Sequence, residues 1–108
     1  MEEFDIAIIG GGPAGIMAAI AASADLNVVL LEKNSSLGSK LLITGGGRCN
    51  ITNEKPIKKL LNSFHDKNFL KHSFYTFTNE MLLDLFRNRG LDFIVEDNNR
   101  VFPETEKS

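Results

Sequence analysis

The chain has 108 residues, enough for one ordinary domain at most. Its 12 Lys+Arg and 14 Asp+Glu give a formal net charge of -2, a balance that argues against a nucleic-acid binder. An apolar fraction of 43% with eight Phe supports a buried core and argues against disorder. The single cysteine, Cys49, excludes a disulfide framework, a dithiol redox pair and a CxxC zinc site, and it indicates a cytoplasmic setting.

Residues 4–31 carry the pattern of a strand, a helix and a second strand. Residues 4–9 form an apolar run ended by three glycines, which is typical of a strand buried on both faces. A helix is expected from Pro13 to about Ala24, and residues 28–31 form a second apolar run that ends before Glu32. A crossover of this length predicts two parallel strands, and hence a Rossmann-like βαβ unit of an α/β fold.

The same stretch contains an uncharged segment, residues 6–24, as long as a membrane-spanning helix. The residues before it are acidic, and three glycines and a proline interrupt it. We therefore expect a soluble protein with no membrane partner.

A glycine motif lies between the first strand and the helix, with the pattern G-x-G-x-x-G. Gly10 permits the tight turn, Gly12 lets the backbone approach a pyrophosphate, and Gly15 lets the helix pack on the strand. The helix N-terminus offers free amides to the diphosphate, and Glu32 can accept from ribose hydroxyls, which disfavours NADP here. A glycine turn without a nucleotide is the alternative interpretation. The predicted dinucleotide contacts are Gly10, Gly11, Gly12, Pro13, Ala14, Gly15 and Glu32.

The rest of the chain predicts a long loop, helices and a β-hairpin. Residues 33–53 are rich in Gly, Ser, Thr and Asn, with room for one helical turn, and two short helices follow Pro56. Thr78 is the expected N-cap of a further helix that ends at Gly90. Strands at residues 91–96 and 100–102 are joined through residues 97–99, which tolerate left-handed turn conformations.

The loop contains the distinctive stretch GSKLLITGGGRCNITN, residues 38–53. Together with the glycine motif it resembles the aminoacetone-oxidase or BaiN-like family of bacterial FAD-binding oxidoreductases. The resemblance continues to residues 100–103, RVFP, so it covers essentially the whole chain. Ser39 stands where that family often has Arg or Lys, and Asn99 where it often has Gly.

The resemblance implies a glutathione-reductase-like FAD domain, in which the first motif holds FAD. Residue chemistry agrees in part: the glycine turn can face an anion or the flavin edge, and Arg48 offers a planar fork to a phosphate or a flavin carbonyl. A purely structural loop, in which polar side chains satisfy their own backbone, is the alternative. Cys49 is interpreted as a small packed side chain, and no metal site is expected. The further predicted cofactor contacts are Lys33, Lys40, Thr44, Gly45, Gly47, Arg48, Cys49 and Asn50.

Three functional hypotheses follow from these motifs. The first is an FAD-dependent oxidoreductase, in which the flavin transfers hydride or electrons. The second is an NAD-binding dehydrogenase domain, which does not explain residues 38–53. The third is a flavoprotein portion: residues 1–108 would be the N-terminal part of the FAD-binding domain, an incomplete domain inactive alone. A small-molecule substrate of unknown identity and NAD(P)H as reductant are the expected partners, and no nucleic acid is expected.

Overall fold

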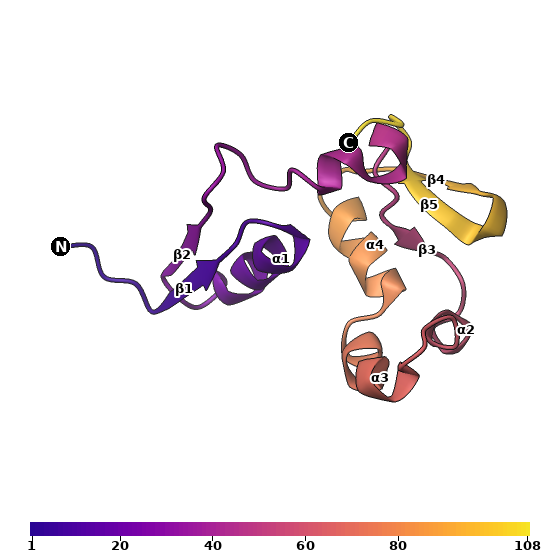
Figure 1. The fold of residues 1–108 in the computed structure, drawn as a ribbon, viewed down its shortest axis with the longest axis horizontal. Coiled ribbons are helices and arrows are strands. Elements are labelled where there is room, and N and C mark those ends of the chain that lie inside the picture. Colours follow the sequence, from indigo (N-terminus) through magenta and orange to yellow (C-terminus); the bar gives the residue numbers. More distant parts are fainter. The chain divides into compact units, whose positions relative to one another are not determined.

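The computed structural model describes all residues, Met1–Ser108. They form two compact units, Met1–Thr44 and Gly45–Ser108, each of which is described by itself. The chain contains strands, α-helices and 3-10 helices, with α2, α3 and α4 following one another (Figure 1).

The first unit contains the predicted strand, helix and strand. Strand β1 (Ile6–Ile9), helix α1 (Pro13–Ala22) and strand β2 (Val28–Leu31) follow one another. The two strands pair in parallel, from Ile6 opposite Val28 to Ile9 opposite Leu31, and α1 packs on both of them. The βαβ prediction is confirmed, with the helix two residues shorter than expected because Ser23 caps it.

The prediction that the first strand is buried on both faces is wrong for this unit. Ile9 is 86% exposed and Ile6 is 37% exposed, and no residue of α1 is buried. The cause is the size of the sheet: β1 and β2 pair only with each other, and one short helix cannot cover both faces.

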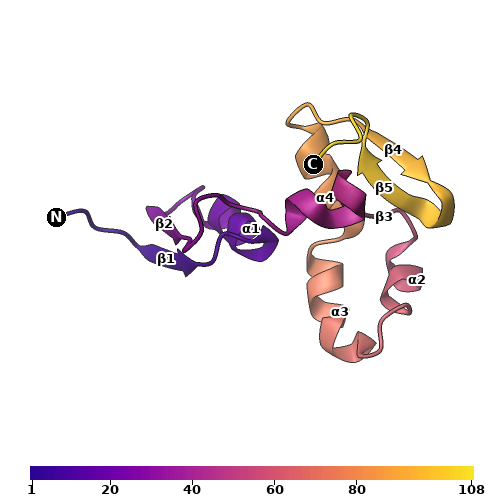
Figure 2. The same cartoon turned by 45° about the horizontal axis from the view of Figure 1, so that its top comes forward.

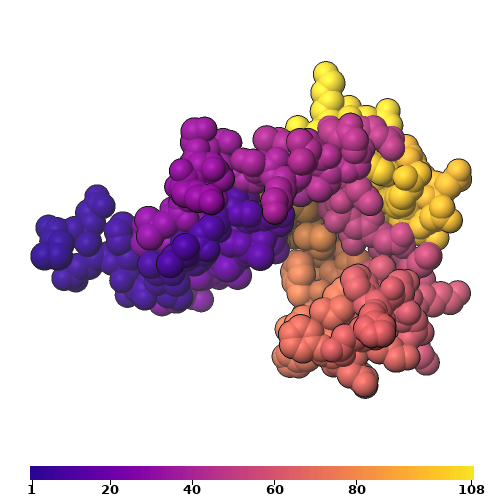
Figure 3. Space-filling model, in the orientation of Figure 1, coloured from indigo at the N-terminus to yellow at the C-terminus, as the bar shows by residue number.

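The second unit builds a small antiparallel sheet with helices beside it. Its strands are β3 (Thr52–Asn53), β4 (Phe93–Glu96) and β5 (Arg100–Pro103), in the order β3-β5-β4. Its helices are α2 (Ile57–Leu61), α3 (Lys67–Thr76) and α4 (Asn79–Arg87). Figure 3 shows the surfaces of α2 and α3 against each other, and Phe64 meets Phe74 edge-on there, with ring centroids 5.2 Å apart.

Two short 3-10 helices complete the chain. Helix η1 (Leu41–Gly47) spans the boundary between the units and supplies the turn expected inside the loop. Helix η2 (Asp97–Asn99) is the connection of the β4–β5 hairpin, which Figure 2 shows beside β3. Asn98 and Asn99 adopt φ angles of 62° and 61°, the left-handed conformation expected of them.

The predicted N-cap of α4 is confirmed. The Thr78 hydroxyl accepts a hydrogen bond from the Met81 amide at 3.2 Å, as expected of the N-cap. The helix ends at Arg87 with Asn88 as its C-cap, three residues before the predicted stop at Gly90, which has φ +83°. The buried apolar side chains of the chain all lie in the second unit: Leu61, Leu83, Val101 and Phe102. No helix of the chain combines the length and the apolar character needed to cross a membrane.

Candidate functional site

The turn between β1 and α1 depends on two glycines for its shape. Gly10 has φ +100°, and its amide donates to the Leu31 carbonyl at 2.8 Å. A β-carbon on Gly15 would meet the Gly10 carbonyl, a backbone atom that cannot move aside cheaply. Both observations agree with the roles expected from the motif, a tight turn and close packing of helix on strand.

Gly12 differs from these two because open space lies in front of it. It is the N-cap of α1 with φ −79°, and a β-carbon built there meets nothing within 4 Å. The amides of Gly12, Ala14 and Gly15 donate no hydrogen bond within the chain, and Pro13 has no amide hydrogen. Three free donors at the positive end of a helix dipole, beside open space, form a site suited to a phosphate group.

The Glu32 carboxylate lies beside this turn. One oxygen accepts from the Gly11 amide at 2.7 Å and the other from the Asn34 amide at 2.8 Å. These backbone hydrogen bonds, that of Asn34 first, lower the pKa of Glu32, so the group is ionised at neutral pH. Each oxygen keeps a further lone pair, and the carboxylate can therefore still accept from two hydroxyl groups.

Sequence reasoning missed the segment that holds Gly11 in place. The Gly38 amide donates to the Gly11 carbonyl at 2.8 Å, and a β-carbon on Gly11 would meet Leu37 and Glu32. Gly11 is buried and hydrogen-bonded on both sides, so its role in the turn is structural. The positive φ of Gly38, +67°, explains why glycine stands there.

The other predicted contacts of the first unit are Lys33, Lys40 and Thr44. Lys33 and Lys40 are exposed and form no ion pair. The Thr44 hydroxyl donates to the Leu41 carbonyl at 2.8 Å, which satisfies it locally. Their assignment to a cofactor stays a prediction.

In the second unit, residues 45–50 are the end of η1 and the residues that follow it, and they have an unusual backbone. Gly45, Gly46, Gly47 and Cys49 all have positive φ angles, between 59° and 84°. A β-carbon on Gly45 would lie 2.8 Å from both the Asn50 nitrogen and the Phe102 ring, so both ends of the loop meet beside that ring. Asn50 is exposed, and neither its side chain nor its main-chain amide is hydrogen-bonded within the chain.

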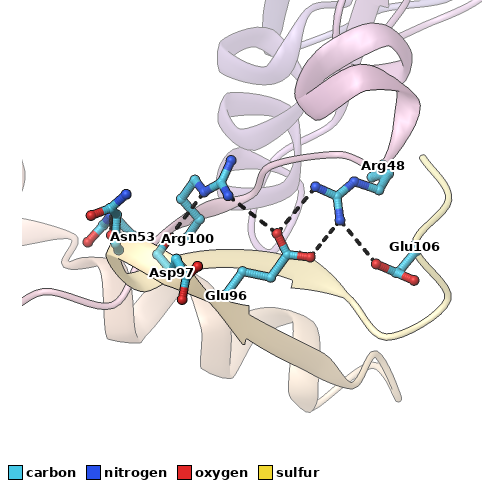
Figure 4. A network of polar contacts seen from close by, with 7 residues as sticks. Arg48, Asn53, Glu96, Asp97, Arg100 and Glu106 are labelled. Atoms are coloured by element: carbon cyan, nitrogen blue, oxygen red, sulfur yellow. Dashed lines mark hydrogen bonds and ion pairs between the residues drawn. The ribbon is translucent and has the colours of Figure 1, made fainter.

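Arg48 lies at the centre of a polar network (Figure 4). Its Nη1 donates to Glu96 at 2.6 Å and to Glu106 at 3.0 Å, and its Nη2 donates to the second Glu96 oxygen at 3.3 Å. The guanidinium also lies over the Phe102 ring, 4.2 Å from its centroid. The Glu96 hydrogen bond raises the pKa of Arg48 further, and the Arg48 hydrogen bond lowers the pKa of Glu96.

Cys49 is half-buried and its thiol has no disulfide partner. No group of three or more His, Cys, Asp and Glu side chains in the chain is arranged to hold a metal ion.

The sequence matches known proteins over most of its length. The model of the HI0933-like protein Rossmann domain matches residues 4–108. A 3-dehydro-bile acid delta(4,6)-reductase of Clostridium scindens is 36% identical over 106 residues, which are 95% of this chain and 25% of that protein. A ribosomal RNA dihydrouridine synthase of Escherichia coli is 38% identical over 94 residues, 84% of this chain and 23% of that protein.

More distant oxidoreductases match a shorter part. A mitochondrial dihydrolipoyl dehydrogenase of Caenorhabditis elegans is 39% identical over 74 residues, 68% of this chain and 13% of that protein. The chain therefore spans at most a quarter of the length of these relatives.

These matches confirm the resemblance to BaiN-like flavoproteins, the Rossmann fold and FAD as the cofactor. The geometry fits that cofactor, because free helix amides, open space at Gly12 and an ionised Glu32 adjoin one turn. The chain belongs to the HI0933-like Rossmann domain family.

Proposed function

We propose that this chain is the FAD-binding portion of a flavin-dependent oxidoreductase, with the FAD diphosphate at residues 10–15 and the adenosine ribose at Glu32. The observation that carries the proposal is the open space at Gly12 beside the free amides of Gly12, Ala14 and Gly15. Phosphate oxygens would accept from these amides without any Lys or Arg. The lone pairs that Glu32 retains would accept from the two ribose hydroxyls.

Further cofactor contacts are proposed along residues 33–50. Lys33 and Lys40 are free cations that can approach a diphosphate. Asn50 offers a free donor and a free acceptor to the flavin edge. The remaining members of this proposed set are Thr44, Gly45, Gly47, Arg48 and Cys49.

Bound FAD would supply hydride or electron transfer, and the protein would supply position and electrostatics. No side chain of residues 1–108 is needed as a general acid or base. Because the chain spans at most a quarter of the length of its relatives, we expect residues 1–108 alone to turn over no substrate.

We propose only the chemical class of the substrate. The relatives named above act on a bile acid and on ribosomal RNA, so related chains serve chemically different substrates. For this protein we propose a small-molecule substrate and NAD(P)H as reductant. The reductant is supported by a similar segment in a ferredoxin–NADP reductase of Bacillus pumilus, 50% identical over 44 residues that are 40% of this chain and 13% of that protein.

Side-by-side titration of the purified protein with FAD and with NAD tests the cofactor assignment. We expect FAD to bind and give a yellow protein, with quenched flavin fluorescence at saturation. A colourless protein that ignores FAD and binds NAD would refute the proposal in favour of a dehydrogenase domain.

A further inference from the structure

We infer that Leu37 is a further binding residue of the nucleotide site: its exposed side chain packs against the base of the adenosine whose ribose lies at Glu32. This inference rests on the proposed function, because it takes the ribose to be held by Glu32. All the residues that carry it belong to the first unit, Met1–Thr44.

Leu37 lies beside the Glu32 carboxylate. A β-carbon on Gly11 would collide with a methyl group of Leu37 and would also lie 3.1 Å from Glu32 Oε2, so the two side chains lie on the same side of Gly11. That Glu32 oxygen accepts from the Gly11 amide at 2.7 Å. The apolar end of Leu37 is therefore a neighbour of the carboxylate to which we assign the ribose.

The segment that carries Leu37 is tied to the site at both ends. At one end, the Asn34 amide donates to Glu32 Oε1 at 2.8 Å. At the other end, the Gly38 amide donates to the Gly11 carbonyl at 2.8 Å, and Gly38 itself is buried. A backbone that is held before the ligand arrives loses less conformational entropy on binding, so this segment is suited to present a contact residue.

Leu37 is an apolar residue in a polar segment, and much of its side chain is open to solvent. The neighbouring residues 33–36, KNSS, and 39–40, SK, are polar and exposed, and Leu37 is 49% exposed although one methyl group packs on Gly11. A leucine that stays half in water contributes less to the stability of the fold than a buried one. Its open surface can instead be covered by an apolar part of a ligand.

The covalent structure of a nucleoside brings its base to the same place. The base is attached to the ribose C1′ atom, next to the C2′ atom that carries one of the hydroxyls assigned to Glu32. The groups that hydrogen-bond to the carboxylate, the amides of Gly11 and Asn34, are polar and offer no surface to the flat face of a base. Ligand sites cover such rings with apolar side chains, and Leu37 is placed to do so.

The difference in affinity between ADP and ribose 5-diphosphate tests this contact, because only ADP carries the base. In isothermal titration calorimetry, the wild-type protein should bind ADP about tenfold more tightly than ribose 5-diphosphate. Leu37→Ala should lose about tenfold in its affinity for ADP and for FAD, and it should bind ribose 5-diphosphate as the wild type does. Equal losses for ADP and ribose 5-diphosphate would overturn the inference, because Leu37 would then act only by holding the turn and Glu32.

Two matched variants separate this contact from an effect on folding. Leu37→Met keeps an apolar side chain of similar volume and should bind ADP within about twofold of the wild type. Leu26→Ala makes the same truncation on a side chain that is 42% exposed and precedes β2, at the opposite end of that strand from Glu32, and should leave the affinity for ADP unchanged. A tenfold loss of ADP affinity in either variant would overturn the inference, because the loss would then not report an apolar contact at this position.

The two proposals fail in different ways. If the wild-type protein binds neither FAD nor ADP, the proposed function is refuted and the contact at Leu37 falls with it. If the wild-type protein binds FAD but shows no preference for ADP over ribose 5-diphosphate, or if Leu37→Ala binds ADP as tightly as the wild type, only the contact at Leu37 is refuted.

Discussion

A methyl group at Gly12 should remove cofactor binding while leaving the protein folded. The backbone angles at Gly12, φ −79° and ψ −179°, suit alanine, and no atom lies within 4 Å of the new carbon. Alanine is a poorer N-cap than glycine but restricts the unfolded chain, and these opposing effects leave the free energy of unfolding within about 1 kcal/mol of the wild type.

The effect on binding is expected to be much larger. The methyl would stand where phosphate oxygens accept from the free amides of Gly12, Ala14 and Gly15. A hydrogen bond to a charged group contributes about 1.5–3 kcal/mol, so losing two of them costs about 3–6 kcal/mol. FAD should then bind roughly a hundredfold to ten-thousandfold more weakly.

Fluorescence titration measures the FAD affinity, and urea unfolding of the ligand-free protein measures the free energy of unfolding. Gly15→Ala is the contrasting variant: its methyl meets the Gly10 carbonyl, and such overpacking costs about 1–3 kcal/mol. Gly15→Ala should therefore lose stability and binding together, whereas Gly12→Ala loses binding alone. A Gly12→Ala protein with wild-type FAD affinity would refute the assignment of the diphosphate to this turn.

Three further changes have defined outcomes. Glu32→Gln should weaken FAD binding roughly tenfold. Since the pKa of Glu32 is lowered, its carboxylate stabilises the fold above the ordinary pKa of 4.5, and this contribution is lost as the pH falls below that value. The free energies of urea unfolding of the wild type and the variant should therefore converge only in acid. Asn79→Ala should lower the free energy of unfolding in urea by about 2–4 kcal/mol, because the buried Asn79 amide donates to the carbonyls of Asn53 at 2.6 Å and Lys55 at 2.9 Å. The control Asn68→Ala changes an exposed side chain and should leave the free energy of unfolding almost unchanged. Cys49→Ser should bind FAD within about twofold of the wild type, because serine keeps a small polar side chain at this position. Cys49 has no second thiol to pair with, so a variant that binds FAD but is no longer reduced by NADPH would give the thiol a chemical role.

The parts of the fold that depend on local chemistry could be predicted from the sequence. The three glycines followed by Pro13 define the turn before α1, Thr78 caps α4, and Asn98 with Asn99 turns the hairpin. Each of these signals acts within a few residues, where backbone conformation and capping decide the outcome. The fold class and the Gly12 site follow from such signals.

The features that the sequence did not predict depend on pairing between segments that are far apart in the chain. Strand β3 has only two residues, both polar, and it exists because β5 supplies the hydrogen bonds. Glu96 lies 48 residues from Arg48, and no periodic pattern connects them. The sequence offers Arg48 to a phosphate or a flavin carbonyl, and nothing in it indicates that Glu96 and Glu106 pair with this guanidinium.

The uneven burial of the two units predicts where FAD will stabilise the protein most. All buried apolar side chains lie in the second unit, and burial of apolar surface is the main source of stability. In hydrogen-exchange mass spectrometry without FAD, the amides of β1, α1 and β2 should therefore exchange faster than those of β4 and β5.

Saturating FAD should reverse much of this difference. A ligand that binds only the folded form at a hundred times its Kd adds about 2.7 kcal/mol to the stability of the part that it holds. Peptides covering residues 6–31 should gain protection, whereas peptides covering β5 should change less. Slow exchange across residues 6–31 before FAD is added would show that the exposed strands of the first unit are stable without the cofactor, and the link between binding and order in this unit would then be wrong.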